Sequence, residues 1–121
     1  MEEKKKKILV VDDEEGSLEM AEIRLKEFGY ETITATNGKD GLRIAEKECP
    51  DLILLDVMMP EMDGGEIAYL LSENPKTKDI PIIFLTSLVS EREEFKRAKG
   101  YLFVAKPFDK EKLLRVIKEA L

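Results

Sequence analysis

Short apolar runs alternate with segments of helical periodicity five times along the 121-residue chain. The runs are four or five residues long and rich in β-branched residues and leucine, as in strands buried on both faces. Between them, apolar residues recur three or four positions apart, which indicates amphipathic helices. We therefore expect an α/β fold of the flavodoxin-like (βα)5 type, with helices on both faces of a parallel sheet in the strand order 2-1-3-4-5.

The predicted strands share a short apolar pattern and are ILVV at 8–11, ETITA at 31–35, LILLD at 52–56, IIFLT at 82–86 and YLFVA at 101–105. ETITA alternates polar and apolar residues, which fits an edge strand. The inward residues of the predicted helices are Leu18, Ala21, Leu25 and Phe28, then Leu42, Ala45 and Cys49, then Ile67, Leu70 and Leu71, and finally Leu113, Leu114, Ile117 and Leu121. A fourth, charged helix is predicted at about 90–99, before the last of these.

Length and charge indicate one domain without a nucleic-acid or membrane surface. The chain is long enough for one core but short for two. Its net charge is −6 and 38% of its residues are charged with both signs, so no broad basic field exists. The basic run Lys4–Lys7 is interpreted as a solvated tail. We expect residues 1–7 to form this tail and residues 8–121 to form the domain.

The missing residue types exclude several classes of protein. No apolar stretch approaches the roughly 20 residues that span a bilayer, and no signal-peptide core follows Met1. We therefore expect a soluble cytoplasmic protein. The single Cys49 excludes an intramolecular disulfide, and the absence of histidine excludes both a Ser/His/Asp triad and a His-ligated zinc site. Cys49 itself is interpreted as a small buried apolar residue.

Polar side chains follow four of the predicted strands where those strands end. Asp12 and Asp13 follow the first strand, Asp56 ends the third, Thr86 ends the fourth and Lys106 follows the fifth. In the order 2-1-3-4-5 the first and third strands are neighbours at the point where strand order reverses, which is where open α/β sheets bind ligands. The pattern therefore predicts a cluster of three carboxylates, a hydroxyl and an ammonium.

Asp56 needs compensation for its charge because it ends a run of apolar residues. An unpaired buried charge costs several kcal/mol or more, and clustered carboxylates repel one another. A Mg²⁺ ion bound by Asp12, Asp13 and Asp56, together with Lys106, would offset both costs. This set also matches phosphoryl transfer, with Asp56 as the nucleophile, Lys106 as the neutralising cation and Thr86 as a hydrogen-bond donor.

Each residue alone has a purely structural explanation. An Asp-Asp pair before a helix is often a cap, and an Asp, Thr or Lys at a strand end is common in turns. The functional interpretation depends on the conjunction, because four separate strands each supply a required group at the same edge of the sheet.

Four segments resemble the signature segments of the receiver domain of two-component response regulators, of which chemotaxis regulators are examples. They are VVDDE at 10–14, LLDVMMPEMDG at 54–64, FLTS at 84–87 and AKPF at 105–108, and the resemblance covers essentially the entire chain. It implies that a histidine kinase or phosphotransfer protein phosphorylates Asp56 in an Mg²⁺-dependent reaction. It also implies that the Met58 backbone carbonyl completes the metal site and that Lys106-Pro107 is a cis peptide.

The same resemblance implies how the signal leaves the site. Thr86 and Phe103 would form a switch pair that changes the face made by the predicted 90–99 helix, the 101–105 strand and the last helix. That face would control a downstream protein target, without direct contact to nucleic acid. The protein would be a monomer or a phosphorylation-dependent dimer, and no enzyme beyond its own phosphorylation and dephosphorylation. One departure from the family pattern is that the segment before Tyr101 is about two residues short.

Two other classes are weighed against this interpretation. A phosphatase of the haloacid dehalogenase type also forms an aspartyl phosphate, but it needs a second acid two residues after the nucleophile. Asp56 is followed by Val57 and Met58, which does not fit. The other class is an interaction module with a degenerate site, and the complete set of acids, Thr86 and Lys106 argues against it. Whether the chain is a complete regulator or a fragment of a longer one stays open.

Overall fold

A computed structural model of the chain describes residues 5–86, 102–106 and 109–121. Within these ranges the strands are β1 (Lys7–Val11), β2 (Glu31–Ala35), β3 (Leu52–Asp56), β4 (Ile82–Thr86) and β5 (Leu102–Ala105). They form one parallel sheet in the order β2-β1-β3-β4-β5. The predicted fold class and strand order are confirmed, and β2 is the edge strand expected from its alternation.

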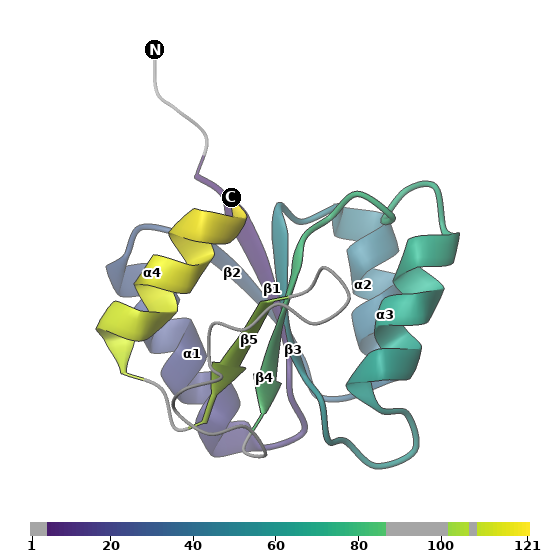
Figure 1. Cartoon of the computed structure of the whole chain (residues 1–121), viewed down its shortest axis with the longest axis horizontal. Helices are drawn as coiled ribbons and strands as arrows, with labels where there is room; N and C mark the ends of the chain where they lie inside the picture. Colours follow the sequence, from purple (N-terminus) through teal and green to yellow (C-terminus); the bar gives the residue numbers. More distant parts are fainter. Residues whose placement is uncertain (1–4, 87–101, 107–108) are drawn as a thin grey trace.

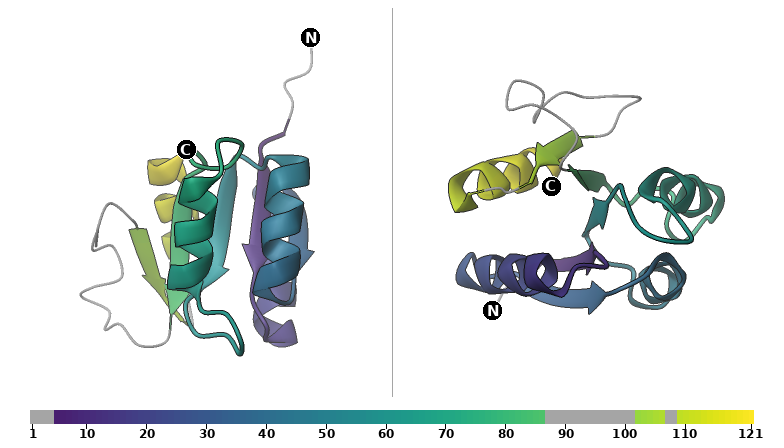
Figure 2. Two further views of the ribbon diagram at one scale, coloured as in Figure 1. Left: turned by 90° about the vertical axis from the view of Figure 1, so that its right-hand side faces the viewer. Right: turned by 90° about the horizontal axis from the view of Figure 1, so that it is seen from below.

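Helices cover both faces of this sheet. They are α1 (Glu15–Glu27), α2 (Gly38–Glu48), α3 (Gly64–Glu73) and α4 (Lys110–Ala120). Helices α1 and α4 lie on one face and α2 and α3 on the other, as the two layers in Figures 1 and 2 show. The helix predicted at about 90–99 lies outside the described residues, as do Tyr101 and Pro107. Among the described helices, none combines the length and apolar composition that crossing a membrane requires.

Side chains alternate along each strand between two core clusters. Every residue of β3 and β4 is buried, which explains why these strands are continuously apolar in the sequence. Strand residues that face α1 and α4 include Ile8, Val10, Leu52, Leu54, Ile83, Leu85, Leu102 and Val104. Strand residues that face α2 and α3 include Leu9, Val11, Ile53, Leu55, Ile82, Phe84 and Phe103. This alternation decides which polar residues can meet beyond the strand ends.

Local signals in the sequence fix the helix ends. The Asn37 side chain accepts a hydrogen bond from the Asp40 N–H at 2.8 Å and caps the start of α2. Asp63 caps α3 in the same way, accepting from the Glu66 N–H at 2.9 Å. Gly29 follows α1 with a φ of 89°, a left-handed conformation that glycine adopts without steric cost.

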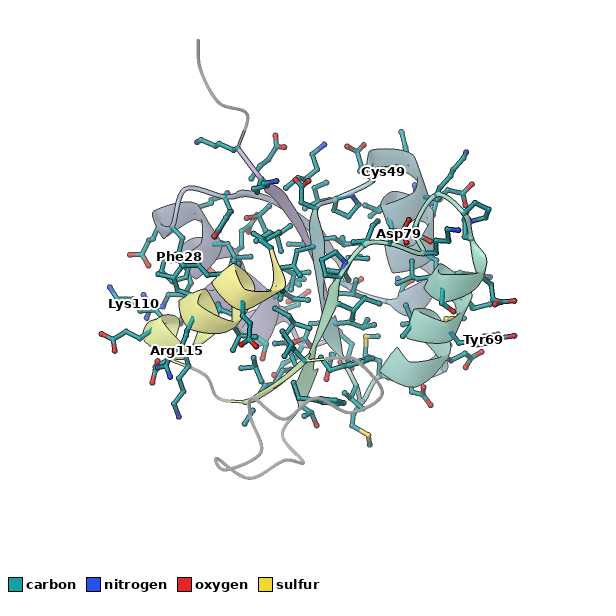
Figure 3. The ribbon with its side chains drawn as sticks, turned by 45° about the horizontal axis from the view of Figure 1, so that its top comes forward. Phe28, Cys49, Tyr69, Asp79, Lys110 and Arg115 are labelled. Atoms are coloured by element: carbon teal, nitrogen blue, oxygen red, sulfur yellow. The ribbon has the colours of Figure 1, made fainter. Side chains whose placement is uncertain are left out.

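Three of the predicted inward residues are exposed instead. Leu70 is 39% exposed, because Ile67, Ala68 and Leu71 form the buried stripe of α3 and Leu70 lies to one side of it. Leu121 is 42% exposed, because it follows the end of α4, which buries Leu113, Val116 and Ile117. Cys49 is exposed because it lies past the end of α2, where its φ of 45° takes it out of the helical repeat (Figure 3).

The core beneath α1 and α4 yields a stability prediction. Replacing the fully buried Leu54 by alanine should lower the free energy of unfolding by about 2–5 kcal/mol, because it leaves a cavity between sheet and helices. Ile23→Ala on the exposed face of α1 is the matched control and should change it by less than about 1 kcal/mol. Urea unfolding measures both, and equal losses would contradict the assigned core.

Candidate functional site

The predicted polar residues end or follow β1, β3, β4 and β5, at the carboxyl edge of the sheet. The strand arrows point to this edge at the bottom of Figure 1. Strands β1 and β3 are parallel neighbours with Val11 opposite Leu55, so Asp12 and Asp56, the next residue of each, lie side by side. β1 also pairs with β2 on its other side, so the crossovers from β1 and β3 leave in different directions. This is the position at which open α/β sheets have a crevice for ligands.

Three carboxylates meet at this edge of the sheet. Asp12, Asp13 and Asp56 each offer one carboxylate oxygen, and these oxygens all lie within 4.8 Å of one another. Asp12 is 0% exposed and Asp56 is 6% exposed, whereas Asp13 is exposed. The predicted cluster of acids is therefore present, with two buried members and one at the rim.

Backbone groups hold the two buried carboxylates in place. The Asp12 N–H donates to the Ala35 carbonyl at 3.1 Å, which extends the β1–β2 ladder by one residue. Asp12 Oδ1 accepts from the Glu14 N–H at 3.0 Å, and Asp56 Oδ1 accepts from the Met58 N–H at 3.3 Å. The loops that follow β1 and β3 therefore donate to the acids they carry.

Lys106 lies among the acids although it is far from them in sequence. Its Nζ is 2.7 Å from Asp12 Oδ2, 3.6 Å from Asp56 Oδ2 and 3.9 Å from Glu14 Oε1. Asp12, Asp56 and Lys106 continue the strand alternation that points Val10, Leu54 and Val104 toward α1 and α4. These three side chains converge because they point to the same face of the sheet. Glu14, which the sequence interpretation did not assign, is a further acid beside Lys106.

Burial and neighbouring charge act on the protonation of Asp56. Burial raises the pKa of the Asp56 carboxyl to about 6, and the negative charge of Asp12 adds to this. The positive charge of Lys106 and the hydrogen bond from the Met58 N–H act in the opposite direction. Asp56 therefore ionises at a higher pH than an ordinary aspartate does.

The ammonium of Lys106 is held in its charged form. Burial disfavours this charge, but the hydrogen bond to Asp12 and the charges of Asp12, Asp56 and Glu14 outweigh it, and the pKa of Lys106 is raised. The site therefore contains a permanent cation beside carboxylates whose mutual repulsion it only partly offsets.

Thr86 ends β4 and lies next to this group. It is buried and pairs in register with Ala105, and its carbonyl accepts from the Lys106 N–H at 2.8 Å. Leu85, the residue before it, pairs with Asp56. Thr86 follows the opposite phase of the strand and lies on the α2 and α3 side, one strand from Asp56. The ends of β1, β3, β4 and β5 are therefore gathered at one edge, as predicted.

The other predicted residues lie around this edge. Met58 is 59% exposed and follows Asp56 by two residues. Phe103 lies in β5, partly buried, with its ring stacked on that of Phe84 at a centroid distance of 5.1 Å. Sequence reasoning did not assign Phe84 a role, since an aromatic residue in a buried strand is read simply as core. The predicted Lys106-Pro107 cis peptide involves Pro107, which lies outside the described residues.

The donor set fits a hard divalent cation such as Mg²⁺. Mg²⁺ takes oxygen ligands, uses one or two carboxylates and keeps several waters. The three carboxylate oxygens are close enough to share one ion, and Asp13 is exposed, so the cluster has one member at the surface. A cation there would also relieve the repulsion that raises the pKa of Asp56.

Comparison with known proteins decides the family. The sequence model of the response regulator receiver domain family matches residues 8–118 of this chain. The chain belongs to this family. As a receiver domain it is a signalling domain of two-component systems, and the resemblance inferred from the four signature segments is confirmed.

The curated relatives are longer than this chain. It is 44% identical to the probable transcriptional regulator ycf27 of Porphyra purpurea over 123 aligned residues, which cover 100% of this chain and 49% of that protein. The chain thus spans about half the length of these curated relatives.

Solved structures share the receiver fold. Chemotaxis protein CheY4 of Vibrio cholerae superposes with a TM-score of 0.87 at 33% identity, covering 98% of this chain and 100% of that one. The receiver domain of sensor histidine kinase PA1611 from Pseudomonas aeruginosa PAO1 has a TM-score of 0.84 at 25% identity, covering 97% and 98%. That structure contains a magnesium ion coordinated in its active site cleft.

The raised pKa of Asp56 predicts a pH-dependent cost to folding. An acid whose pKa is higher in the folded state stabilises the fold below its unfolded value of 3.8, and this contribution is lost as pH rises through about 6. We compare the free energy of unfolding of Asp56→Asn with that of the wild type, without divalent cations. As pH rises from about 4 to about 7.5, this difference should shift by about 1–3 kcal/mol in favour of Asp56→Asn. Urea unfolding at the two pH values measures this shift.

Asp79→Asn provides the control, because Asp79 is an exposed carboxyl at the opposite edge of the sheet (Figure 3). It should show no comparable difference between the two pH values. A pH-independent effect of Asp56→Asn would contradict the environment described for Asp56.

Proposed function

We propose that Asp56 is the residue that accepts a phosphoryl group, from a histidine kinase or a histidine phosphotransfer protein. The observation that carries this proposal is the grouping of Asp56 with Asp12, Asp13 and Lys106 at the carboxyl edge of β1 and β3. Receiver-family membership supports it. The residue roles, the cytoplasmic location and the division into an N-terminal tail and an 8–121 domain are parts of this proposal. The predicted 1–7 boundary of the tail is one residue too long, because Lys7 is the first residue of β1 and its Nζ lies 3.1 Å from Glu48 Oε1.

Asp56 is better placed for attack than Asp12. Both oxygens of Asp12 are engaged, Oδ1 with the Glu14 N–H at 3.0 Å and Oδ2 with Lys106 Nζ at 2.7 Å. The contacts of Asp56 are longer, at 3.3 Å to the Met58 N–H and 3.6 Å to Lys106 Nζ. An oxygen that is held less tightly keeps more of its nucleophilic character. The Asp56 carboxylate is therefore the acceptor and Asp12 a positioning group.

The transfer follows from these positions. A carboxylate oxygen of Asp56 attacks the phosphorus of a phosphohistidine, a P–O bond forms, and the P–N bond breaks with its electron pair staying on the imidazole nitrogen. Lys106 neutralises charge on the phosphoryl oxygens, and the Thr86 hydroxyl donates to one of them. Mg²⁺ held by Asp12, Asp13, Asp56 and the Met58 carbonyl would supply further charge neutralisation. Hydrolysis of the acyl phosphate by water returns the carboxylate.

The output would be a change of surface and not the turnover of an external substrate. A phosphoryl group adds close to two negative charges and three acceptors, which would draw Thr86 and Lys106 toward it. Phe103 would follow into the space that Thr86 leaves. The face made by the predicted 90–99 helix, β5 and α4 would then control a downstream protein. Such a switch needs two arrangements within a few kcal/mol of each other.

Phosphorylation of Asp56 is tested by intact mass. The protein incubated with Mg²⁺ and a small acyl phosphate should gain one phosphoryl mass, and Asp56→Asn should not, because the nucleophile is removed. Asp51→Asn, at the opposite end of the same strand, is the matched control and should label like the wild type. Equal labelling of Asp56→Asn and the wild type would exclude Asp56 as the acceptor.

Metal binding is tested by thermal stability. Millimolar Mg²⁺ should raise the melting temperature of the wild type, since an ion that binds only the folded state stabilises it. The rise should be much smaller in Asp13→Ala, which lacks the exposed ligand, and unchanged in Asp79→Ala. A wild-type melting temperature that does not respond to Mg²⁺ would count against this site.

A further inference from the structure

The ring of Phe84 lies between the strand end that carries Asp56 and the ring of Phe103. Phe84 is buried in β4 and is paired in register with Phe103 of β5. The two rings stack with centroids 5.1 Å apart and planes 26° apart, within the range of favourable aromatic pairs. A displacement of one ring would therefore disturb the packing of the other, because close-packed side chains have little free space.

Phe84 also meets the start of α3. A methyl group at Gly64 would lie 3.3 Å from Phe84 Cε1, 2.9 Å from Val57 Cα and 2.7 Å from the Asp56 carbonyl oxygen. The Gly64 N–H donates to the Val57 carbonyl at 2.9 Å. Only a residue without a Cβ allows this approach. The backbone of Asp56 and Val57, the first residue of α3 and the Phe84 ring are thus packed in series.

We propose that Phe84 is a positioning residue that transmits movement of the Asp56–Val57 backbone to Phe103. This inference rests on the proposed function, in which Phe103 is the aromatic switch residue. Phe84 and Thr86 point to the same face of β4, and Thr86 is the diagonal neighbour of Phe103, since it pairs with Ala105. The Thr86 hydroxyl responds to the phosphoryl oxygens, and the Phe84 ring responds to the backbone. The position of Phe103 therefore depends on the movement of both Thr86 and Phe84.

The test compares Phe84→Leu with the wild type. Each protein is labelled with ring-¹³C phenylalanine and titrated with beryllofluoride and Mg²⁺, and the Phe103 signal is identified by its loss in Phe103→Leu. Phe84→Leu keeps an apolar side chain but loses the stacked ring, so it should still bind beryllofluoride. The ratio of the two Phe103 states at saturation should fall by about fivefold, the effect of losing one aromatic pair.

Phe28→Leu is the matched control, because Phe28 packs on the opposite core cluster beside α1. Its Phe103 response should equal that of the wild type. At saturating beryllofluoride, Phe84→Leu combined with Thr86→Ala should lower the response further than either change alone, as two parallel routes require. If Phe84→Leu does not fold, Phe84→Met is used instead, since methionine fills irregular space without a ring.

Three outcomes would overturn the inference in distinguishable ways. A full Phe103 response in Phe84→Leu would show that the ring transmits nothing. Loss of beryllofluoride binding in Phe84→Leu would show that Phe84 builds the site and does not relay from it. Failure of the wild type to bind beryllofluoride would overturn the proposed function itself, and this inference with it.

Discussion

The arrangement of the site depends on the ion pair between Lys106 and Asp12. Asp12 is completely buried at the end of β1, where an uncompensated carboxylate would be costly, and Lys106 Nζ lies 2.7 Å from it. The same ammonium reaches Asp56 at 3.6 Å, so one cation serves two buried acids. The compensation is incomplete, and the pKa of Asp56 remains raised to about 6. An incompletely compensated acidic site is suited to taking up a cation and the charge that a phosphoryl group brings.

The sheet produces this arrangement through its alternation. Asp12, Asp56 and Lys106 continue the strand phase that faces α1 and α4, whereas Thr86 continues the phase shared by Phe84 and Phe103. The carboxylates of Asp12 and Asp56 and the ammonium of Lys106 therefore meet where phosphoryl transfer is proposed. The Thr86 hydroxyl and the rings of Phe84 and Phe103 lie on the other face of the sheet, toward β5. Gly64 joins the layers, because it lets α3 start against the backbone of Asp56.

Much of this was predictable because the signals are local. Continuous apolar runs identified the buried strands, and the helix ends at Asn37 and Gly29 carry residue types that are typical of caps. Parallel order then placed Asp12, Asp56, Thr86 and Lys106 at one edge. Exposure at helix margins was not predictable for Leu70, Leu121 and Cys49, since it depends on which neighbours complete the buried stripe. The roles of Glu14 and Phe84 required distances between side chains on different elements, which no spacing in the sequence encodes.

Chemical identification of the phosphorylated residue tests the central claim most directly, because Asp12 and Asp56 are both buried carboxylates beside the same ammonium. The phosphorylated protein is reduced with borohydride, which converts an aspartyl phosphate to homoserine, and its peptides are sequenced by mass spectrometry. The weaker engagement of Asp56 predicts homoserine at position 56 alone. Homoserine at position 12 or 13 would contradict the account.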